Sequence, residues 1–139
     1  LTVSLPRLRP AAGEFEPRYP LPDRELLQLI CALRLTFPQV GIVMSTREPA
    51  PLRDVAARIG VTMMSAGSHT EPGGYTGQGA EQLHLTVRGR AVACETPAQA
   101  ATEQFAISDT RTAAEVASML TGAGLDPVWK DWDAAILGA

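Results

Sequence analysis

Two short apolar runs, residues 40–44 and residues 61–64, constrain the fold of this chain more than any other feature. Each is too short for a helix and almost wholly apolar, which is typical of a parallel strand covered on both faces. The stretch between them has room for one helix, which Pro51 would begin and Gly60 would end. The expected apolar stripe of this helix is Leu52, Val55, Ala56 and Ile59. Since so short a connection joins only parallel neighbours, the pattern predicts a β-α-β unit.

The same pattern extends towards the start of the chain. Val3 and Leu5 alternate with polar neighbours, as in a strand that ends near Pro6. After a proline-rich loop, Asp23 is expected to cap a second amphipathic helix. The apolar face of that helix is expected to hold Leu26, Ile30, Leu33 and Phe37. The sequence thus predicts an α/β fold class with consecutive βα units.

The third strand is followed by its helix only after a long interval. Alternating residues on either side of Gly89 predict a small β-hairpin, and Thr112 and Glu115 have the spacing of a capping box that opens a last helix. We expect a single domain over residues 1–139. Within it, residues 78–101 are expected to form an insertion or loop, and residues 102–139 the final helix and tail.

The composition argues against several classes of function. A net charge of −3 without a basic face does not favour nucleic acid as a partner. No apolar run approaches the roughly 20 residues that cross a bilayer, so no membrane is expected, and no signal peptide is recognisable, so the cytoplasm is the expected location. Cys31 and Cys94 match no metal or redox spacing, and Cys31 is expected to be buried in its helix. We therefore expect no metal ligand and no catalytic residue on this chain.

Polar residues follow the predicted strands, at the edge where α/β proteins bind ligands. The guanidinium of Arg47 could clamp a carboxylate through two parallel hydrogen bonds, although an ion pair with Glu48 or Glu71 explains this arginine equally well. Ser65, followed closely by Gly67, offers a hydroxyl and approachable backbone amides for the same carboxylate or its amino group. These small residues are equally suited to a tight turn.

Two further residues belong to the same candidate site. Ser45 opens the loop that carries Arg47, and Arg7 lies at the end of the first strand. If that strand alternates, either Arg7 or Arg9 points inward and the other is a surface charge. The candidate substrate-binding set is therefore Arg7, Ser45, Arg47, Ser65 and Gly67.

Several runs of residues together carry a family resemblance: residues 3–10, 30–35, 45–48, 65–68 with 72–75, and 127–133. In order and in residue type they resemble the carboxyl-terminal part of the 2-iminoacetate synthase family, the radical S-adenosylmethionine tyrosine lyases of thiamine biosynthesis. The region corresponds to the biotin and thiamin synthesis associated domain. The resemblance covers almost the whole chain, and the closing Trp-Lys-Asp-Trp-Asp is its most specific part.

The resemblance implies a fold and an activity. The fold would be the last three βα units of a radical S-adenosylmethionine barrel, incomplete as a stand-alone chain. The reaction would cleave the Cα–Cβ bond of L-tyrosine to 2-iminoacetate and p-cresol for thiazole formation, using a [4Fe–4S] cluster and S-adenosyl-L-methionine. The amino-terminal half-barrel and thiazole synthase would be its partners. In the wider group, an arginine and a serine matching Arg47 and Ser65 hold the carboxylate and backbone end of the substrate.

The chain departs from the family in what it lacks. The Cys-x3-Cys-x2-Cys cluster motif and the main S-adenosylmethionine contacts are absent, so this chain alone is expected to be inactive. A sequence that opens on a strand at Leu1, without a methionine, is expected to be a piece of a longer protein. Two alternatives stay open. One is the related tyrosine lyase of hydrogenase maturation, which usually carries a cysteine-bearing extension beyond this region, and the other is a non-catalytic binding module.

Overall fold

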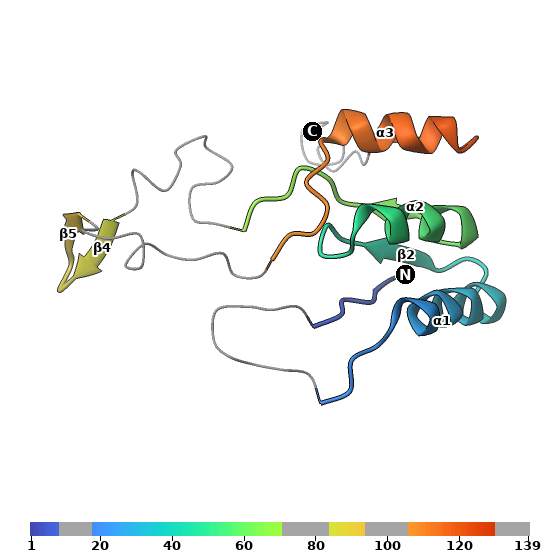
Figure 1. Ribbon diagram of the computed structural model, residues 1–139, viewed down its shortest axis with the longest axis horizontal. Helices are drawn as coiled ribbons and strands as arrows, with labels where there is room; N and C mark the ends of the chain where they lie inside the picture. The colour runs from blue at the N-terminus through green and yellow to red at the C-terminus, as the bar shows by residue number, and fades with distance from the viewer. Residues whose placement is uncertain (9–17, 71–83, 94–105, 130–139) are drawn as a thin grey trace, which may run out of the picture.

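The computed structural model describes residues 1–8, 18–70, 84–93 and 106–129. Figure 1 shows the predicted succession of strands and helices, and along the chain the hairpin follows the third strand and precedes the last helix. The elements are β1 (Thr2–Ser4), α1 (Asp23–Thr36), β2 (Gly41–Met44), α2 (Ala50–Ile59), β3 (Met63–Met64), β4 (His84–Val87), β5 (Arg90–Ala93) and α3 (Ala113–Gly122). None of the described helices is long and apolar enough to cross a membrane.

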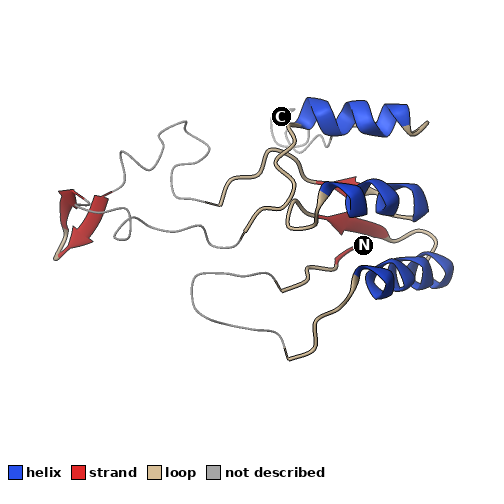
Figure 2. Ribbon diagram, in the orientation of Figure 1, coloured by secondary structure: helices blue, strands red, loops and turns tan. Residues whose placement is uncertain are grey.

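The first three strands form one parallel sheet in the order β1-β2-β3. Val3 lies opposite Ile42, and Val43 lies opposite Met63. Helix α1 packs against α2, and α2 packs against α3, so the three helices stand in a row beside the sheet (Figure 2). The parallel β-α-β-α-β arrangement is confirmed.

The hydrophobic core lies between β2 and the first two helices. Leu26 and Ile30 of α1 are fully buried, and they meet Ile42 of β2 and Ala56 of α2 in one apolar cluster. Full burial of each leucine or isoleucine side chain stabilises the fold by roughly 1.5–3 kcal/mol. This core fixes the ends of β2 and β3, where the candidate site residues begin.

Several finer predictions about the helices are wrong. Pro22, not Asp23, is the N-cap of α1, and the Asp23 carboxylate binds Arg7 instead of a backbone amide. On α2, Val55 is 46% exposed, while Arg53 occupies the buried face. The reason is that Arg53 meets polar partners inside the molecule, so the helix turns a charged residue inward.

Two side chains of α1 are also more exposed than the sequence predicts. Cys31 is a free and exposed thiol, because it lies about 100° round the helix from the buried Ile30. Phe37, predicted on the apolar face, caps the helix end and is 57% exposed.

The predicted hairpin is confirmed. Strands β4 and β5 pair antiparallel, with Val87 opposite Arg90. The two residues between them, Arg88 and Gly89, both have positive φ, +50° and +78°, as a type I′ hairpin turn requires. Residues 78–83 and 94–101 of the predicted insertion lie outside the described residues, as do Arg9, Glu71, Cys94 and Trp132.

The capping box at the start of α3 is confirmed as well. The Thr112 hydroxyl accepts a hydrogen bond from the Glu115 amide at 3.3 Å, and the Glu115 carboxylate accepts one from the Thr112 amide at 2.8 Å. The hydrogen bonds that the Glu115 carboxylate accepts from the Thr112 amide and from the Thr112 hydroxyl lower the pKa of Glu115. The helix thus begins where the sequence predicts.

Removing this cap should weaken the protein measurably. We expect Thr112→Ala to lower the free energy of unfolding by about 1 kcal/mol, because the Glu115 amide loses the hydroxyl that accepts its hydrogen bond and the Glu115 carboxylate loses the one that the hydroxyl donates. Urea denaturation followed by circular dichroism measures the change. Thr121→Ala, an exposed position in the last turn of the same helix, is the matched control and should cost nothing. Equal effects of both substitutions would contradict a specific contribution from the cap.

Candidate functional site

The loops that follow β2 and β3 meet at the carboxyl edge of the sheet. The Ser65 amide donates to the carbonyl of Met44 at 3.2 Å, which continues the strand pairing beyond β3. The Thr46 amide in turn donates to the Ser65 hydroxyl oxygen at 3.2 Å. The structure therefore brings the loop of Ser45 and Arg47 together with Ser65, two of the segments that the sequence singled out.

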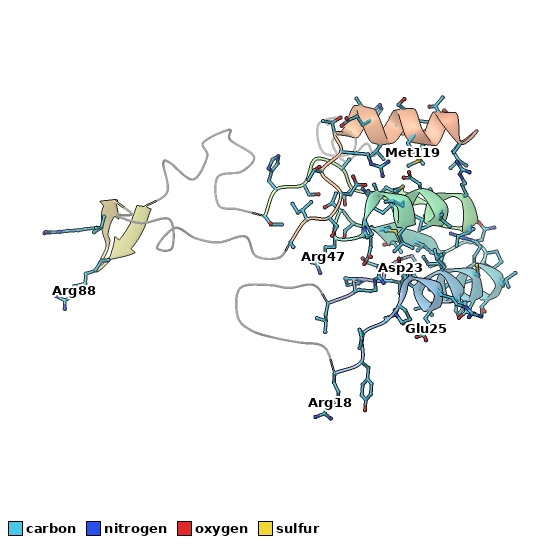
Figure 3. All side chains as sticks on the ribbon, viewed as in Figure 1. Arg18, Asp23, Glu25, Arg47, Arg88 and Met119 are labelled. Carbon is cyan, nitrogen blue, oxygen red and sulfur yellow. The ribbon has the colours of Figure 1, made fainter. Side chains whose placement is uncertain are left out.

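The Arg47 side chain turns away from the core. Its neighbours Thr46 and Glu48 are only 2% and 3% exposed, whereas Arg47 is half-buried. Figure 3 shows its side chain at the margin of the α/β body, beyond the ends of the strands. This is the position from which a guanidinium can reach a ligand at the sheet edge.

Arg7 is engaged with residues of its own chain. Its Nε donates to both carboxylate oxygens of Glu48 at 3.0 and 3.1 Å, and Nη2 is paired with the same carboxylate. Its Nη1 donates to the Leu21 carbonyl at 2.9 Å and to Asp23 at 2.7 Å. The hydrogen bond to Glu48 is the main cause that raises the pKa of Arg7. Arg7 thus ties the end of β1 to the loop of Arg47.

Ser45 and Gly67 shape the backbone of the two loops. The Ser45 carbonyl accepts a hydrogen bond from the Glu48 amide at 3.3 Å, which closes a turn around Arg47. Gly67 has φ of +57°, and a Cβ built there would meet no atom within 4 Å. Glycine is therefore favoured at this position by backbone conformation and not by lack of space. Its amide donates to the carbonyl of Arg111 at 3.1 Å.

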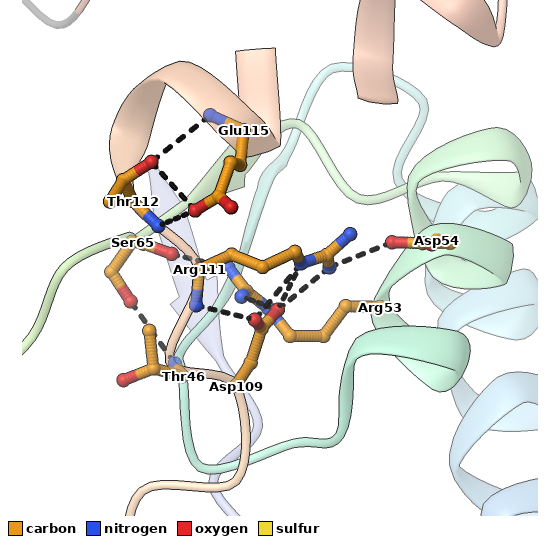
Figure 4. Close-up of polar contacts among 8 residues, drawn as sticks. All are labelled: Thr46, Arg53, Asp54, Ser65, Asp109, Arg111, Thr112 and Glu115. Carbon is orange, nitrogen blue, oxygen red and sulfur yellow. Dashed lines mark hydrogen bonds and ion pairs between the residues drawn. The ribbon is translucent and has the colours of Figure 1, made fainter. Parts of the chain in front are cut away.

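Beneath these loops lies a buried polar cluster that sequence reasoning missed. Arg53, which is fully buried, pairs through Nη1 with Asp109 and donates through Nη2 to the Ser65 carbonyl (Figure 4). Asp109 also accepts hydrogen bonds from Arg111 at 2.7 to 3.2 Å. Arg111 extends the cluster to Asp54 at 2.8 Å.

The charges of the cluster stabilise one another. Burial alone would raise the pKa of Asp109, but the hydrogen bonds from Arg111 and the charge of Arg53 outweigh it and lower that pKa to about 2. Burial lowers the pKa of Arg53, and the neighbouring Asp109 partly offsets this effect. Hydrogen bonds to Asp109 and Asp54 raise the pKa of Arg111. Asp109, Arg53 and Arg111 are therefore charged at neutral pH.

Only a weak sequence signal pointed to this cluster. Arg53 stands next to Leu52 and three residues before Ala56, on the side of α2 that faces the core. A charged residue at such a position needs a buried partner. That partner, Asp109, lies 56 residues further along the chain, so nothing local identifies it.

A groove of about 780 Å³ runs along β3 and α3. Met63, Met64 and Ser65 line it from the sheet, and Val116 and Leu120 line it from the helix. β3 is the last strand of the sheet within the described residues, so the groove follows an edge that could accept a further strand.

The described residues do not fit a [4Fe–4S] cluster. Over residues 1–8, 18–70, 84–93 and 106–129, no group of three histidine, cysteine or acidic side chains could hold a metal ion. Cys31 stands exposed on α1 and is the free cysteine of this part of the chain. Such a cluster normally takes several cysteine thiolates, which this site does not offer.

Comparison with curated proteins shows that the chain is similar to 2-iminoacetate synthases. It is 39% identical over 132 residues to a 2-iminoacetate synthase of Escherichia coli (strain K12), and equally to one of Salmonella typhimurium (strain LT2). The match covers 95% of this chain and 30% of each relative, so the chain spans about a third of their length.

Solved structures show the same relationship. The [FeFe]-hydrogenase maturase HydG from Carboxydothermus hydrogenoformans matches with a TM-score of 0.62 at 34% identity, over 89% of this chain and 24% of that one. A further HydG crystal structure matches with a TM-score of 0.66 at 28% identity, over 89% and 23% of the two chains. The sequence profile described as Biotin and Thiamin Synthesis associated domain matches residues 4–126. Because this match spans most of its length, the chain belongs to the Biotin and Thiamin Synthesis associated domain family.

Proposed function

We propose that this chain is the carboxyl-terminal portion of a lyase of the 2-iminoacetate synthase kind. The whole enzyme would cleave the Cα–Cβ bond of L-tyrosine to 2-iminoacetate and p-cresol, and so supply thiazole formation in thiamine biosynthesis. The observation that carries the proposal is the 39% identity, over 95% of the chain, to two enzymes of that name. The match covers 30% of each relative. In this proposal the present portion would contribute substrate-binding residues, and the remainder of the parent chain would supply the rest of the enzyme.

We also propose that the three βα units are the last three of a barrel. The parallel order β1-β2-β3, with helices in a row beside the sheet, supports this placement. The groove along β3 supports it too, because a barrel needs a further strand there. That strand would come from the amino-terminal half of the parent chain. The same half would bind the [4Fe–4S] cluster and S-adenosyl-L-methionine, and thiazole synthase would take up the product.

The proposed role of the carboxyl edge is to hold the main-chain end of tyrosine. Arg47 would bind the carboxylate through two parallel hydrogen bonds. The Ser65 hydroxyl accepts a bond from Thr46, and a hydroxyl that accepts still has its own hydrogen to donate to the substrate. For Ser45 and Gly67 we propose contacts through backbone groups other than the Gly67 amide, which already donates to the Arg111 carbonyl. Of the five proposed substrate-binding residues, Arg7 has the least support, because its guanidinium already forms ion pairs with Glu48 and Asp23.

The products of the full-length protein test this function. We expect the reconstituted enzyme to form p-cresol from L-tyrosine, together with one equivalent of 2-iminoacetate, detected as glyoxylate after hydrolysis. Liquid chromatography of both products measures the ratio, and protein without added S-adenosyl-L-methionine is the control. A protein that binds L-tyrosine but forms no p-cresol would contradict the lyase proposal.

A second candidate is a tyrosine lyase of hydrogenase maturation. Its support is the similarity to two HydG structures, the better with a TM-score of 0.66. The product ratio separates the two candidates. A p-cresol yield that clearly exceeds the glyoxylate yield would indicate an enzyme that consumes the two-carbon fragment further, and would overturn the first candidate.

A further inference from the structure

We propose that Arg53 is a positioning residue for substrate binding, which holds the Ser65 and Arg47 loops in the geometry that grips an amino-acid carboxylate. This inference rests on the proposed function and deepens it. Arg53 touches no substrate in this proposal. It acts through Ser65 and Thr46, the residues at and beside the proposed contacts.

The observation behind the proposal is a closed ring of hydrogen bonds, of which Figure 4 draws those that Arg53, Ser65 and the Thr46 amide make. Arg53 donates to the Ser65 carbonyl, and the Ser65 hydroxyl accepts from the Thr46 amide at 3.2 Å. The Thr46 carbonyl accepts from the Asp109 amide at 3.0 Å and from the Ser108 amide at 2.9 Å. The ion pair between the Asp109 carboxylate and Arg53 closes the ring.

Through Arg53 on α2, the ring joins three further segments of the chain. They are the loop after β2, the start of the loop after β3, and the segment that leads into α3. Thr46, Arg53 and Asp109 are each 2% exposed or less, so water does not compete for their hydrogen bonds. A planar guanidinium can serve two acceptors only in one orientation, which fixes Ser65 and Asp109 relative to each other.

The composition of the ring argues for a geometric role. Burying an ion pair is a weak source of stability, and apolar side chains of similar volume often serve as well. Arg53 moreover keeps its Nε buried without a hydrogen-bond partner within the described residues, which costs free energy. What the arginine provides and an apolar side chain cannot is a donor to the Ser65 carbonyl. This bond sets the direction of the Ser65 hydroxyl and, through Thr46, the backbone that carries Arg47.

The test compares ligands with and without a carboxylate. The full-length holoenzyme is titrated calorimetrically with L-tyrosine and with tyramine, which lacks only the carboxylate. The ratio of the two affinities measures the carboxylate grip within the folded protein, so a loss of stability alone does not move it. The variants are Arg53→Met, which removes the donor, and Arg53→Lys, which keeps one charge-assisted bond. Arg58→Met, at an exposed position of the same helix, is the matched control.

We expect Arg53→Met to lower the tyrosine-to-tyramine affinity ratio about tenfold or more, since small misplacements of binding groups have large effects. Arg53→Lys should lower it less, and Arg58→Met should leave it unchanged. If Arg53→Met does not fold, Arg53→Lys carries the test. The positioning role would be overturned if Arg53→Met had the same affinity ratio as the unsubstituted protein. If Arg53→Met does not fold, the same outcome in Arg53→Lys would overturn it. An unsubstituted protein that shows no preference for tyrosine over tyramine would instead overturn the proposed carboxylate site itself.

Discussion

Replacing Arg47 with alanine in the full-length enzyme is expected to lower kcat/KM for L-tyrosine about 100-fold, mainly through a higher KM. A charge-assisted, two-pronged bond to a carboxylate contributes about 3 kcal/mol, which corresponds to that factor. The side chain lies at the carboxyl edge of the sheet, away from the core, so its removal should leave the fold intact. Steady-state kinetics over a range of tyrosine concentrations measures the effect.

Two controls sharpen this experiment. Arg58→Ala removes an exposed arginine of α2 and should not change the KM. Arg47→Lys keeps the charge but loses the forked geometry, and should fall between alanine and the unsubstituted enzyme. The visible absorbance of the cluster should be the same in all variants. A tyrosine KM that is unchanged in Arg47→Ala would refute the carboxylate clamp and favour a structural ion pair for this arginine.

Asp109→Asn is expected to cause the largest loss of stability, about 3–5 kcal/mol. The substitution leaves the guanidinium of Arg53 fully buried without its counter-charge, and breaking a buried pair from one side is strongly destabilising. Urea denaturation of the chain at pH 7, followed by circular dichroism, measures the loss. Asp126→Asn, at an exposed aspartate, is the control and should stay within about 0.5 kcal/mol.

The same variant should reveal a dependence on pH. Asp109 has a pKa of about 2 in the folded protein, below its ordinary value of 3.8, so the unfolded chain binds more protons between these values. Its contribution is therefore present above pH 4 and is lost as the pH falls towards 2. The stability gap between the unsubstituted chain and Asp109→Asn should narrow by roughly 2 kcal/mol over this window. A gap that stays constant would contradict the low pKa of Asp109.

The fold was predictable wherever its cause is local. Two apolar runs joined by one short helix permit little other than parallel strands, and the capping box at Thr112 and the turn at Gly89 depend on a few neighbouring residues. Predictions about which helix face is buried failed more often. The prediction placed Val55, and not Arg53, on the inner face of α2, because it rested on the hydrophobicity of the side chains alone.

The sequence predicted where the candidate site lies, but not the buried residues that hold its loops in place. Arg47 and Ser65 could be placed together because the ends of neighbouring parallel strands meet at one edge. The partners beneath them could not, since Arg53 and Asp109 come together only when α2 and the segment before α3 have packed. The two arginines of the predicted substrate-binding set also differ in what the structure says of them. Arg7 is committed to Glu48, while the role proposed for Arg47 awaits its kinetic test.

The ring of hydrogen bonds around Thr46 bears on how much the segment between Ser65 and Asp109 can vary in length among members of this family. It ties Ser65 and Asp109 to the same residue, so both ends of the intervening segment are held at fixed points of the core. Closing a longer loop between fixed points costs little, about 0.6 kcal/mol for each doubling of its length. Relatives could therefore gain or lose residues between these two anchors, the β4–β5 hairpin included, without displacing the edge on which Arg47 stands.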